Sequence, residues 1–255
     1  MSVYKSLSLR IRKSILKIGY LSKASHLGSC LSIVDILSVL YIKFLKTKKN
    51  SFILSKGHGC LAQYCALKEI GLISKKTLKT FGQNDTILMS HVSHEVPGID
   101  LSTGSLGHGL PVASGMALAD KINKLKSRTF VILSDGELNE GSNWESLLFC
   151  SHHKLNNLTI IIDYNKIQSI DFVENTSKIE PLKMKLESFG CKVLSVEGHN
   201  HGQLLRALST YSSKTLVIIA NTTKGKGVKF MENTVLWHYK NLSAADYQKA
   251  IKEIK

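Results

Sequence analysis

The chain of 255 residues is short of proline and arginine and has no long apolar run. Only three prolines occur, so long helices and strands are permitted. No apolar stretch approaches the length of about 18 residues that a membrane-spanning helix needs, and we expect no membrane contact. Internal repeats, low-complexity tracts and obvious linkers are also missing. We therefore expect one domain over residues 1–255.

Arginine is scarce although the chain is strongly basic. The formal net charge is +15, yet the 34 basic residues include only Arg10, Arg12, Arg128 and Arg206 as arginines. Base readout and bidentate grips on phosphate favour arginine, and no nucleic-acid-binding motif is present. We therefore expect no nucleic-acid partner. The basic charge mainly reflects a lysine-rich background composition, and a phosphorylated substrate is a secondary reason for it.

The five cysteines have irregular spacing and form no CxxC pair. This pattern indicates reduced, buried thiols in a cytoplasmic protein instead of a disulfide framework or a zinc site. The first twenty residues are basic and free of acids, as in a transit peptide. Apolar residues at helical spacing nevertheless favour a first structural helix. They are Leu9, Ile11, Ile15, Leu16, Ile18 and Leu21.

Helical and strand-like patterns alternate along the chain. Strands are predicted at 51–54, 129–134, 158–163, 192–196 and 215–220, and helices near 5–22, 31–45, 60–70, 107–124, 141–153, 181–189 and 202–211. The almost continuously apolar strands suit a sheet that is buried on both sides. The alternation predicts an α/β fold, with a mostly parallel sheet and helices on both faces. Ligands of such folds lie beyond the carboxyl ends of the strands, here after Leu133 and Ile162.

The strongest motif joins the ends of two predicted strands. The first strand, at 129–134, leads into the motif Ser-Asp-Gly-Glu-Leu-Asn-Glu-Gly at 134–141, and Asn165 follows the next strand. Gly136 lets a ligand approach the backbone, and a helix beginning near Glu140 would offer unpaired N–H groups. Asp135 and Asn165 supply one carboxylate and one amide oxygen to a Mg²⁺ shell that phosphate oxygens and water would complete. The pair predicts a magnesium clip for a diphosphate.

This composite resembles the thiamine diphosphate-binding motif of transketolases. Taken alone, Asp135 and Asn165 could be a helix cap and a turn residue. Other segments resemble the same family, in family order, over about residues 9–240. They are Ser-His-Leu-Gly at 25–28, Leu-Ser-Lys-Gly-His-Gly at 54–59, Ser-Thr-Gly-Ser-Leu-Gly-His-Gly at 102–109, Leu-Asn-Asn-Leu at 155–158, Asp-Tyr-Asn-Lys-Ile-Gln at 163–168, Thr-Lys-Gly-Lys-Gly-Val at 223–228 and Trp-His at 237–238.

The resemblance implies a thiamine diphosphate-binding fold and gives roles to individual residues. The Mg²⁺ ligands would be Asp135, Asn165 and the carbonyl of Ile167. The cofactor contacts would be His58, Gly104, Ser105, Leu106, Gly136, Asn165 and His238. The catalytic histidines of the substrate channel would be His26, His91 and His238. Imidazoles suit proton exchange with sugar hydroxyls near neutral pH.

Three positions depart from the family pattern. The first glycine of the motif is Ser134, and the proline after the first histidine is Leu27. The family's Gly-His-Pro is replaced by Ser-His-Val at 90–92, and His94 is a second candidate for the channel histidine. We favour His91. These changes leave cofactor binding in place and the donor and acceptor sugars open.

The resemblance also predicts a partner. A full transketolase continues into a pyrimidine-binding domain, whose glutamate activates the cofactor, and no matching segment occurs in residues 1–255. We expect a subunit that transfers two-carbon ketol units between sugars or sugar phosphates only with a C-terminal transketolase subunit, as two copies of each chain. The Gly104 turn and the helix from Glu140 should lie at the interface, with Trp144 and Leu147 as exposed apolar contacts.

Two other readings of the function remain. The chain could be a subunit of another thiamine diphosphate enzyme, such as a 2-oxo-acid dehydrogenase, although the histidine loops favour a sugar-handling enzyme. It could also be a non-catalytic relic of the fold. A released site would be free to lose His26, His58, Asp135 and Asn165, and their presence argues against that reading.

Overall fold

The computed structural model describes residues 1–46 and 49–254. Its described part contains one sheet of five strands in the order β1-β2-β3-β5-β4, and every pairing is parallel. The strands are β1 Ser51–Leu54, β2 Thr129–Ser134, β3 Leu158–Tyr164, β4 Lys192–Glu197 and β5 Leu216–Asn221. Each predicted strand overlaps an observed one, and the predicted α/β fold is confirmed. The sheet is parallel throughout, where a mostly parallel one was expected.

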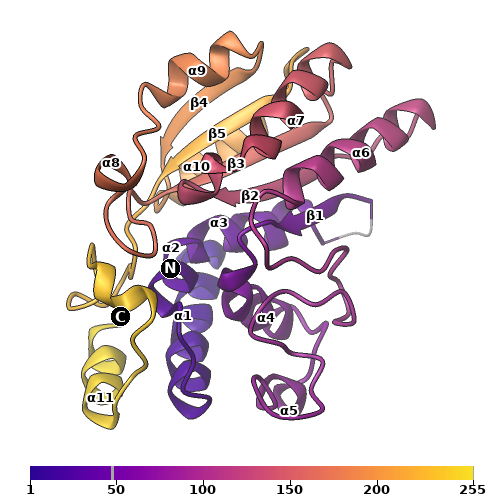
Figure 1. The fold of residues 1–255 in the computed structure, drawn as a ribbon. Coiled ribbons are helices and arrows are strands. Elements are labelled where there is room, and N and C mark those ends of the chain that lie inside the picture. The colour runs from indigo at the N-terminus through magenta and orange to yellow at the C-terminus, as the bar shows by residue number, and fades with distance from the viewer. Residues whose placement is uncertain (47–48, 255) are drawn as a thin grey trace.

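Helices cover both faces of the sheet (Figure 1). The helices α1, α2, α3, α4, α10 and α11 share one hydrophobic cluster with the sheet, and α6, α7 and α9 share a second cluster with its other face. The bounds are α1 Val3–Leu21, α2 Leu27–Ser32, α3 Val34–Val39, α4 Cys60–Glu69, α5 Lys75–Leu78, α6 Gly109–Ile122, α7 Gly141–His152, α8 Val173–Thr176, α9 Leu182–Ser188, α10 His201–Leu208 and α11 Ala244–Glu253.

The apolar strands divide their side chains between the two clusters. In β2, Phe130 and Ile132 belong to the cluster beneath α1–α4, whereas Val131 and Leu133 belong to the cluster beneath α6 and α7. Successive side chains of a strand point to opposite faces, so a strand buried on both sides is almost continuously apolar. The run at 129–134 is apolar except at its ends, Thr129 and Ser134, and all of its residues are buried.

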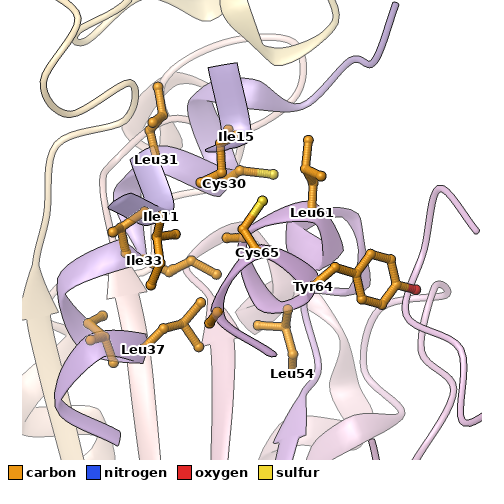
Figure 2. Packing of buried hydrophobic residues seen from close by; sticks show 14 of the residues in the cluster. Ile11, Ile15, Cys30, Leu31, Ile33, Leu37, Leu54, Leu61, Tyr64 and Cys65 are labelled. Carbon is orange, nitrogen blue, oxygen red and sulfur yellow. The ribbon is translucent and has the colours of Figure 1, made fainter. Parts of the chain in front are cut away.

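The first helix is structural, as its spacing predicted. Ile11 and Ile15 of α1 are fully buried and lie against residues of α2 and α4, including Leu31 and Leu61 (Figure 2). Leu21 was assigned to the buried stripe and is 60% exposed, because it is the last residue of the helix. All five cysteines are free and buried. Within the described residues, no helix is long and apolar enough to cross a membrane.

The predicted helix at 31–45 is broken. α2 begins at Leu27, Ile33 separates it from α3, and a π-helical turn follows at Leu40–Phe44. The early start reflects a tertiary contact, because the N–H of His26 donates to the carbonyl of His238. α11 was not predicted, although Ser243 and Asp246 form a capping box at its start.

Candidate cofactor and active site

A pocket of about 250 Å³ opens beyond the carboxyl ends of β2 and β3. The register pairs Ser134 with Asp163, so the residues after these two strands are neighbours. Every residue that we predicted for the site lines this pocket except Ser105, which is exposed on the turn. The full lining is His26, Ser29, Lys56, His58, His91, Gly104, Leu106, Ser134, Asp135, Gly136, Asn165, Ile167, Gln168, Ser169, Lys224, His238 and Tyr239.

The three predicted metal ligands lie on two adjacent loops. The carboxylate of Asp135 accepts hydrogen bonds from the N–H groups of Gly136 at 2.8 Å and Lys166 at 2.5 Å. The Asn165 side-chain oxygen accepts from the N–H of Ile167 at 3.1 Å. These short-range bonds fix both side chains at the strand ends. One carboxylate, one amide oxygen and one carbonyl therefore gather in one corner of the pocket.

A cation already contacts this corner. The Lys224 side chain is buried, and its Nζ donates to the carbonyl of Ile167 at 3.0 Å and to that of Gln168 at 3.1 Å. Burial and the nearby Lys56 ammonium lower the pKa of Lys224 to about 8. Burial and the neighbouring Asp163 carboxylate raise the pKa of Asp135 to about 7. Both charged forms are therefore disfavoured by burial in this corner.

A buried ion pair lies beneath the pocket. Lys56 Nζ contacts Asp163 Oδ2 at 2.5 Å, and both side chains are almost fully buried. Asp163 also accepts hydrogen bonds from Ser32 at 2.7 Å, from Thr222 and from the Asn165 amide at 3.1 Å. Burial opposes the charged form of Asp163, but the Lys56 ammonium and these donors lower its pKa. The network anchors Asn165 from below.

Glu137 joins the motif to the turn at 104–107. Its carboxylate accepts hydrogen bonds from Ser55, from the N–H of Gly107 at 3.0 Å and from the N–H of Ser134 at 3.2 Å. The Ser134 hydroxyl in turn accepts from the Glu137 N–H at 3.2 Å. The serine in place of the family's glycine is thus accommodated as a local cap.

Four histidines and a tyrosine line the open side of the pocket. The His26 ring centroid lies 5.4 Å from that of His58, 5.0 Å from that of His238 and 6.3 Å from that of His91. His94 does not line the pocket, and its Nδ1 lies 2.7 Å from the Ser102 hydroxyl. Of the two candidate channel histidines, only His91 belongs to the cluster.

The clustered histidines have low pKa values and bind protons weakly. Burial, together with His91 and Lys224, lowers the pKa of His26 to about 4. Burial and the Lys224 ammonium lower the pKa of His238 to about 3, and burial and Lys56 hold that of His58 well below its ordinary value. These imidazoles are therefore neutral near pH 7 and weakly basic, which suits them to accept hydrogen bonds from hydroxyl groups.

The pocket fits a magnesium diphosphate. A Cβ on Gly136 would lie 3.1 Å from Cγ of Gln168, so a side chain there would crowd the pocket wall. The Nε2 of Gln168 is buried without a hydrogen-bond partner in the described residues, and a ligand oxygen would satisfy it. No cluster of three His, Cys, Asp or Glu side chains in that part could hold a metal alone. The metal would therefore need phosphate oxygens as further ligands.

Sequence reasoning missed five polar residues of the site, of which all but Gln168 are buried. Lys56 and Lys224 stand inside segments that resembled the family, but a lysine is almost never fully buried and its type gives no signal. Asp163 and Glu137 stood in the motif without an assigned role, because their partners come from distant loops. Gln168 had no signal beyond its place after Ile167.

The expected apolar contacts of α7 were wrong in part. Leu147 is 1% exposed and belongs to the core beneath the helix. Trp144 is half-buried, and its Nε1 donates to the Leu138 carbonyl at 2.7 Å. The next positions along the helix are the exposed ones, Leu148 at 61% and Phe149 at 38%. The helix begins at Gly141, with Glu140 as its N-cap.

We define the α6–α7 face as Val112, Gly115, Leu148 and Phe149. Val112 is 39% exposed, and a Cβ on Gly115 would meet nothing within 4 Å. The face therefore offers apolar side chains beside an open stretch of helix backbone. Such a surface suits close approach by another chain.

Comparison with known proteins agrees with the geometry. Residues 11–254 match the family model described as transketolase, thiamine diphosphate binding domain. A relative from Actinobacillus succinogenes, named as one subunit of an apulose-4-phosphate transketolase, is 40% identical over 257 residues, which cover 96% of this chain and 93% of that protein. A relative from a Clostridium species, named 6-deoxy-6-sulfo-D-fructose transketolase subunit SqwG, is 35% identical over 258 residues, with 96% and 92% covered.

A solved structure gives the same result at the level of the fold. Transketolase from Leishmania mexicana superposes with a TM-score of 0.91 at 26% identity over 100% of this chain. The match covers 41% of the Leishmania chain. This chain thus spans about two-fifths of the length of that solved transketolase.

Proposed function

The chain belongs to the transketolase family, and from that premise we propose that it is the cofactor-binding subunit of a two-subunit transketolase. Together with its partner it transfers a two-carbon ketol unit from a ketose phosphate to an aldehyde acceptor. The observation that carries this proposal is the single pocket in which Asp135, Asn165 and a histidine cluster meet. The two bacterial relatives are named as transketolase subunits, which supports a divided enzyme.

Each side of the pocket has its own task. Asp135, Asn165 and the carbonyl of Ile167 would hold Mg²⁺, with Gly136 leaving room for the diphosphate. The Nε2 of Gln168, which has no partner in the described residues, offers a donor to the phosphate oxygens. Thiamine diphosphate supplies, when bound, the carbon that carries the two-carbon unit.

The histidines would handle the substrate. His26, His91 and His238 line the pocket, and the ring centroid of His58 lies 5.8 Å from that of His238. Burial keeps His26 and His238 neutral and weakly basic. Each would accept a hydrogen bond from a sugar hydroxyl and take its proton as that hydroxyl becomes acidic in the transition state. Positioned proton transfer of this kind contributes about 10²–10⁴-fold to a rate.

The partner would complete the site. We propose a C-terminal transketolase subunit that carries the pyrimidine-binding domain, in an assembly of two copies of each chain with residues 1–255 as one domain. The Gly104 turn borders the pocket, and the α6–α7 face is apolar and exposed. Both are proposed as partner contacts. A cytoplasmic location is consistent with the five free thiols.

The test is reconstitution. The chain is purified alone and with the product of a neighbouring reading frame that encodes a pyrimidine-binding domain, and size and ketol transfer are measured with a ketose phosphate and, separately, a 2-oxo acid. We expect transfer from the ketose phosphate only when both chains are present. Robust transfer by this chain alone would refute the divided enzyme, and turnover of the 2-oxo acid alone would refute the transketolase assignment.

A matched pair of variants tests the interface. Leu148→Asp should weaken association with the partner, because it places a charge on the α6–α7 face. Met184→Asp on α9 changes an equally exposed residue (67% against 61%) outside that face and should not. Equal binding by both variants, measured by analytical ultracentrifugation, would remove the α6–α7 face from the proposal.

A further inference from the structure

Tyr239 has no role in the proposed division of tasks, yet it lines the pocket. It follows the 3₁₀ turn Val235–His238 directly and is 59% exposed. Single exposed aromatic residues are common on protein surfaces and need no explanation. Tyr239 differs because it stands where the pocket opens, beside the histidines that would meet the substrate.

The tyrosine ring is held by two of those histidines. Its centroid lies 4.6 Å from that of His238, at an interplanar angle of 59°, and 5.3 Å from that of His26, at 69°. Separations and tilts of this kind are the preferred geometry for aromatic pairs. Two ring contacts therefore fix the orientation of Tyr239, and the remaining surface of its ring stays open to solvent.

The chemistry of this open ring differs from that of its neighbours. The pocket lining is otherwise dominated by imidazoles, ammonium groups, amides and a carboxylate, which recognise hydroxyl and phosphate groups. A sugar phosphate also has a carbon chain with C–H groups, and a fixed aromatic ring can cover these at little cost in side-chain entropy. Tyr239 is the aromatic group of the pocket lining that can do this.

We infer that Tyr239 is a substrate-contact residue whose ring packs against the carbon chain of the sugar phosphate. This inference rests on the proposed function and adds a determinant of substrate length to it. A long acceptor such as an aldose phosphate extends past His26 to the ring, whereas a two-carbon aldehyde is too short to gain from it. The phenol oxygen is not required for this contact.

The test uses the assembled two-chain enzyme with Mg²⁺ and thiamine diphosphate. Tyr239→Ala should raise KM for ribose 5-phosphate about three- to tenfold, the loss expected for one aromatic contact. It should leave KM for glycolaldehyde and the affinity for the cofactor unchanged. Tyr239→Phe should behave like the parent enzyme. Tyr211→Ala is the control, because Tyr211 is 88% exposed and does not line the pocket.

Other outcomes overturn the inference in distinct ways. An unchanged KM for ribose 5-phosphate in Tyr239→Ala would remove the contact. An equally large rise of KM in Tyr239→Phe would assign the substrate contact to the hydroxyl instead of the ring. Weaker cofactor binding by Tyr239→Ala would mean that Tyr239 only holds His238 in place. If the parent enzyme transfers no ketol unit, the proposed function fails. Calorimetric binding of ribose 5-phosphate to the parent and Tyr239→Ala complexes then still decides whether the ring contacts the sugar.

Discussion

The backbone N–H of His26 donates to the backbone carbonyl of His238 at 2.8 Å. The bond joins the start of α2 to the 3₁₀ turn near the other end of the chain, and it brings the two rings within 5.0 Å. His26 adopts a left-handed conformation, with φ at 62°, to make it. Because main-chain atoms hold these loops together, the imidazoles can be replaced without separating the loops.

Replacement of the two joined histidines should remove turnover and keep the cofactor. His26→Asn suits the left-handed backbone, which asparagine tolerates better than alanine, and His238→Ala is its counterpart. We expect kcat to fall about 10²–10⁴-fold in each. Calorimetric affinity for Mg²⁺ and thiamine diphosphate should stay near that of the parent in His26→Asn. In His238→Ala, which also removes a predicted cofactor contact, it should fall less than in Asp135→Ala. Unimpaired turnover of every accepted sugar by His26→Asn would exclude its channel role.

His58 should behave differently, since the family resemblance assigns it to the cofactor and not to the substrate channel. His58→Ala is expected to lower the affinity for thiamine diphosphate as well as kcat.

The choice between the two neighbouring histidines can be made directly. His91 belongs to the ring cluster and lines the pocket, whereas His94 does not line it and is bonded to Ser102. His91→Ala should therefore reduce kcat/KM for the sugar at least about tenfold, and His94→Ala should change it less than about twofold. Steady-state kinetics of the two variants side by side is sufficient, and a reversed order would assign the channel to His94.

The predicted Mg²⁺ site can be tested by replacing its one carboxylate ligand, Asp135. Asp135→Ala should abolish Mg²⁺-dependent binding of thiamine diphosphate to the assembled enzyme, with a loss above about 100-fold. The fold should persist, because the buried carboxylate has no salt bridge in the described residues. Asn165→Ala should weaken binding similarly. Glu145→Ala, an exposed position on α7, is the control, and unchanged calorimetric affinity in Asp135→Ala would refute the clip.

The histidine cluster should make stability depend on pH. Burial depresses the pKa of His26 from 6.5 to about 4 and that of His238 to about 3. Below pH 6.5 the unfolded chain takes up protons that the folded chain excludes. Stability is therefore complete above pH 6.5 and is lost as the pH falls toward 4, by up to about 1.4 kcal/mol per pH unit for each histidine.

Urea unfolding of the chain at several pH values measures this slope. The double variant His26→Asn/His238→Gln should flatten it, whereas the exposed His152→Gln should not. An equally steep loss of stability in the double variant would place its origin elsewhere.

Replacing one member of the buried pair Lys56–Asp163 should lower the free energy of unfolding more than replacing both. Lys56→Met leaves a buried carboxylate without its cation and should cost about 3–5 kcal/mol in the free energy of unfolding. Adding Asp163→Asn to it should recover much of this loss. The exposed pair Lys183–Glu187 is the comparison, where Lys183→Met should cost less than about 1 kcal/mol. Additive losses in the double variant would contradict a coupled pair.

The strands were predictable because their physics is local. A strand buried on both sides is almost continuously apolar, and the run at 158–163 shows this with Thr159 and Asp163 as its polar exceptions. The strand ends then located Asp135 and Asn165 without any knowledge of the tertiary structure. Loop histidines could be placed only through their resemblance to a family, since the bond between His26 and His238 joins distant parts of the chain.

What failed depended on neighbours that the sequence does not show. Leu147 and Leu148 are identical in type and adjacent, and only the packing of α7 on the sheet decides which one is buried. The buried position of Lys224 depends on carbonyls that a separate loop supplies. The break at Ile33 lies in a run with good helical spacing, and it follows from how α2 is attached at His26.

The two halves of the pocket rest on different supports. Asp135 and Asn165 follow strands that both hydrophobic clusters hold, whereas the His91 loop is joined to the turn at 102–104 by the isolated bridge between Val92 and Thr103. Val92 of that loop is buried in the core, but the exposed positions of the loop, such as His91, can change without disturbing the core or the diphosphate corner. Natural selection can therefore move such a protein from one sugar to another over evolutionary time while its vitamin-derived cofactor stays the same.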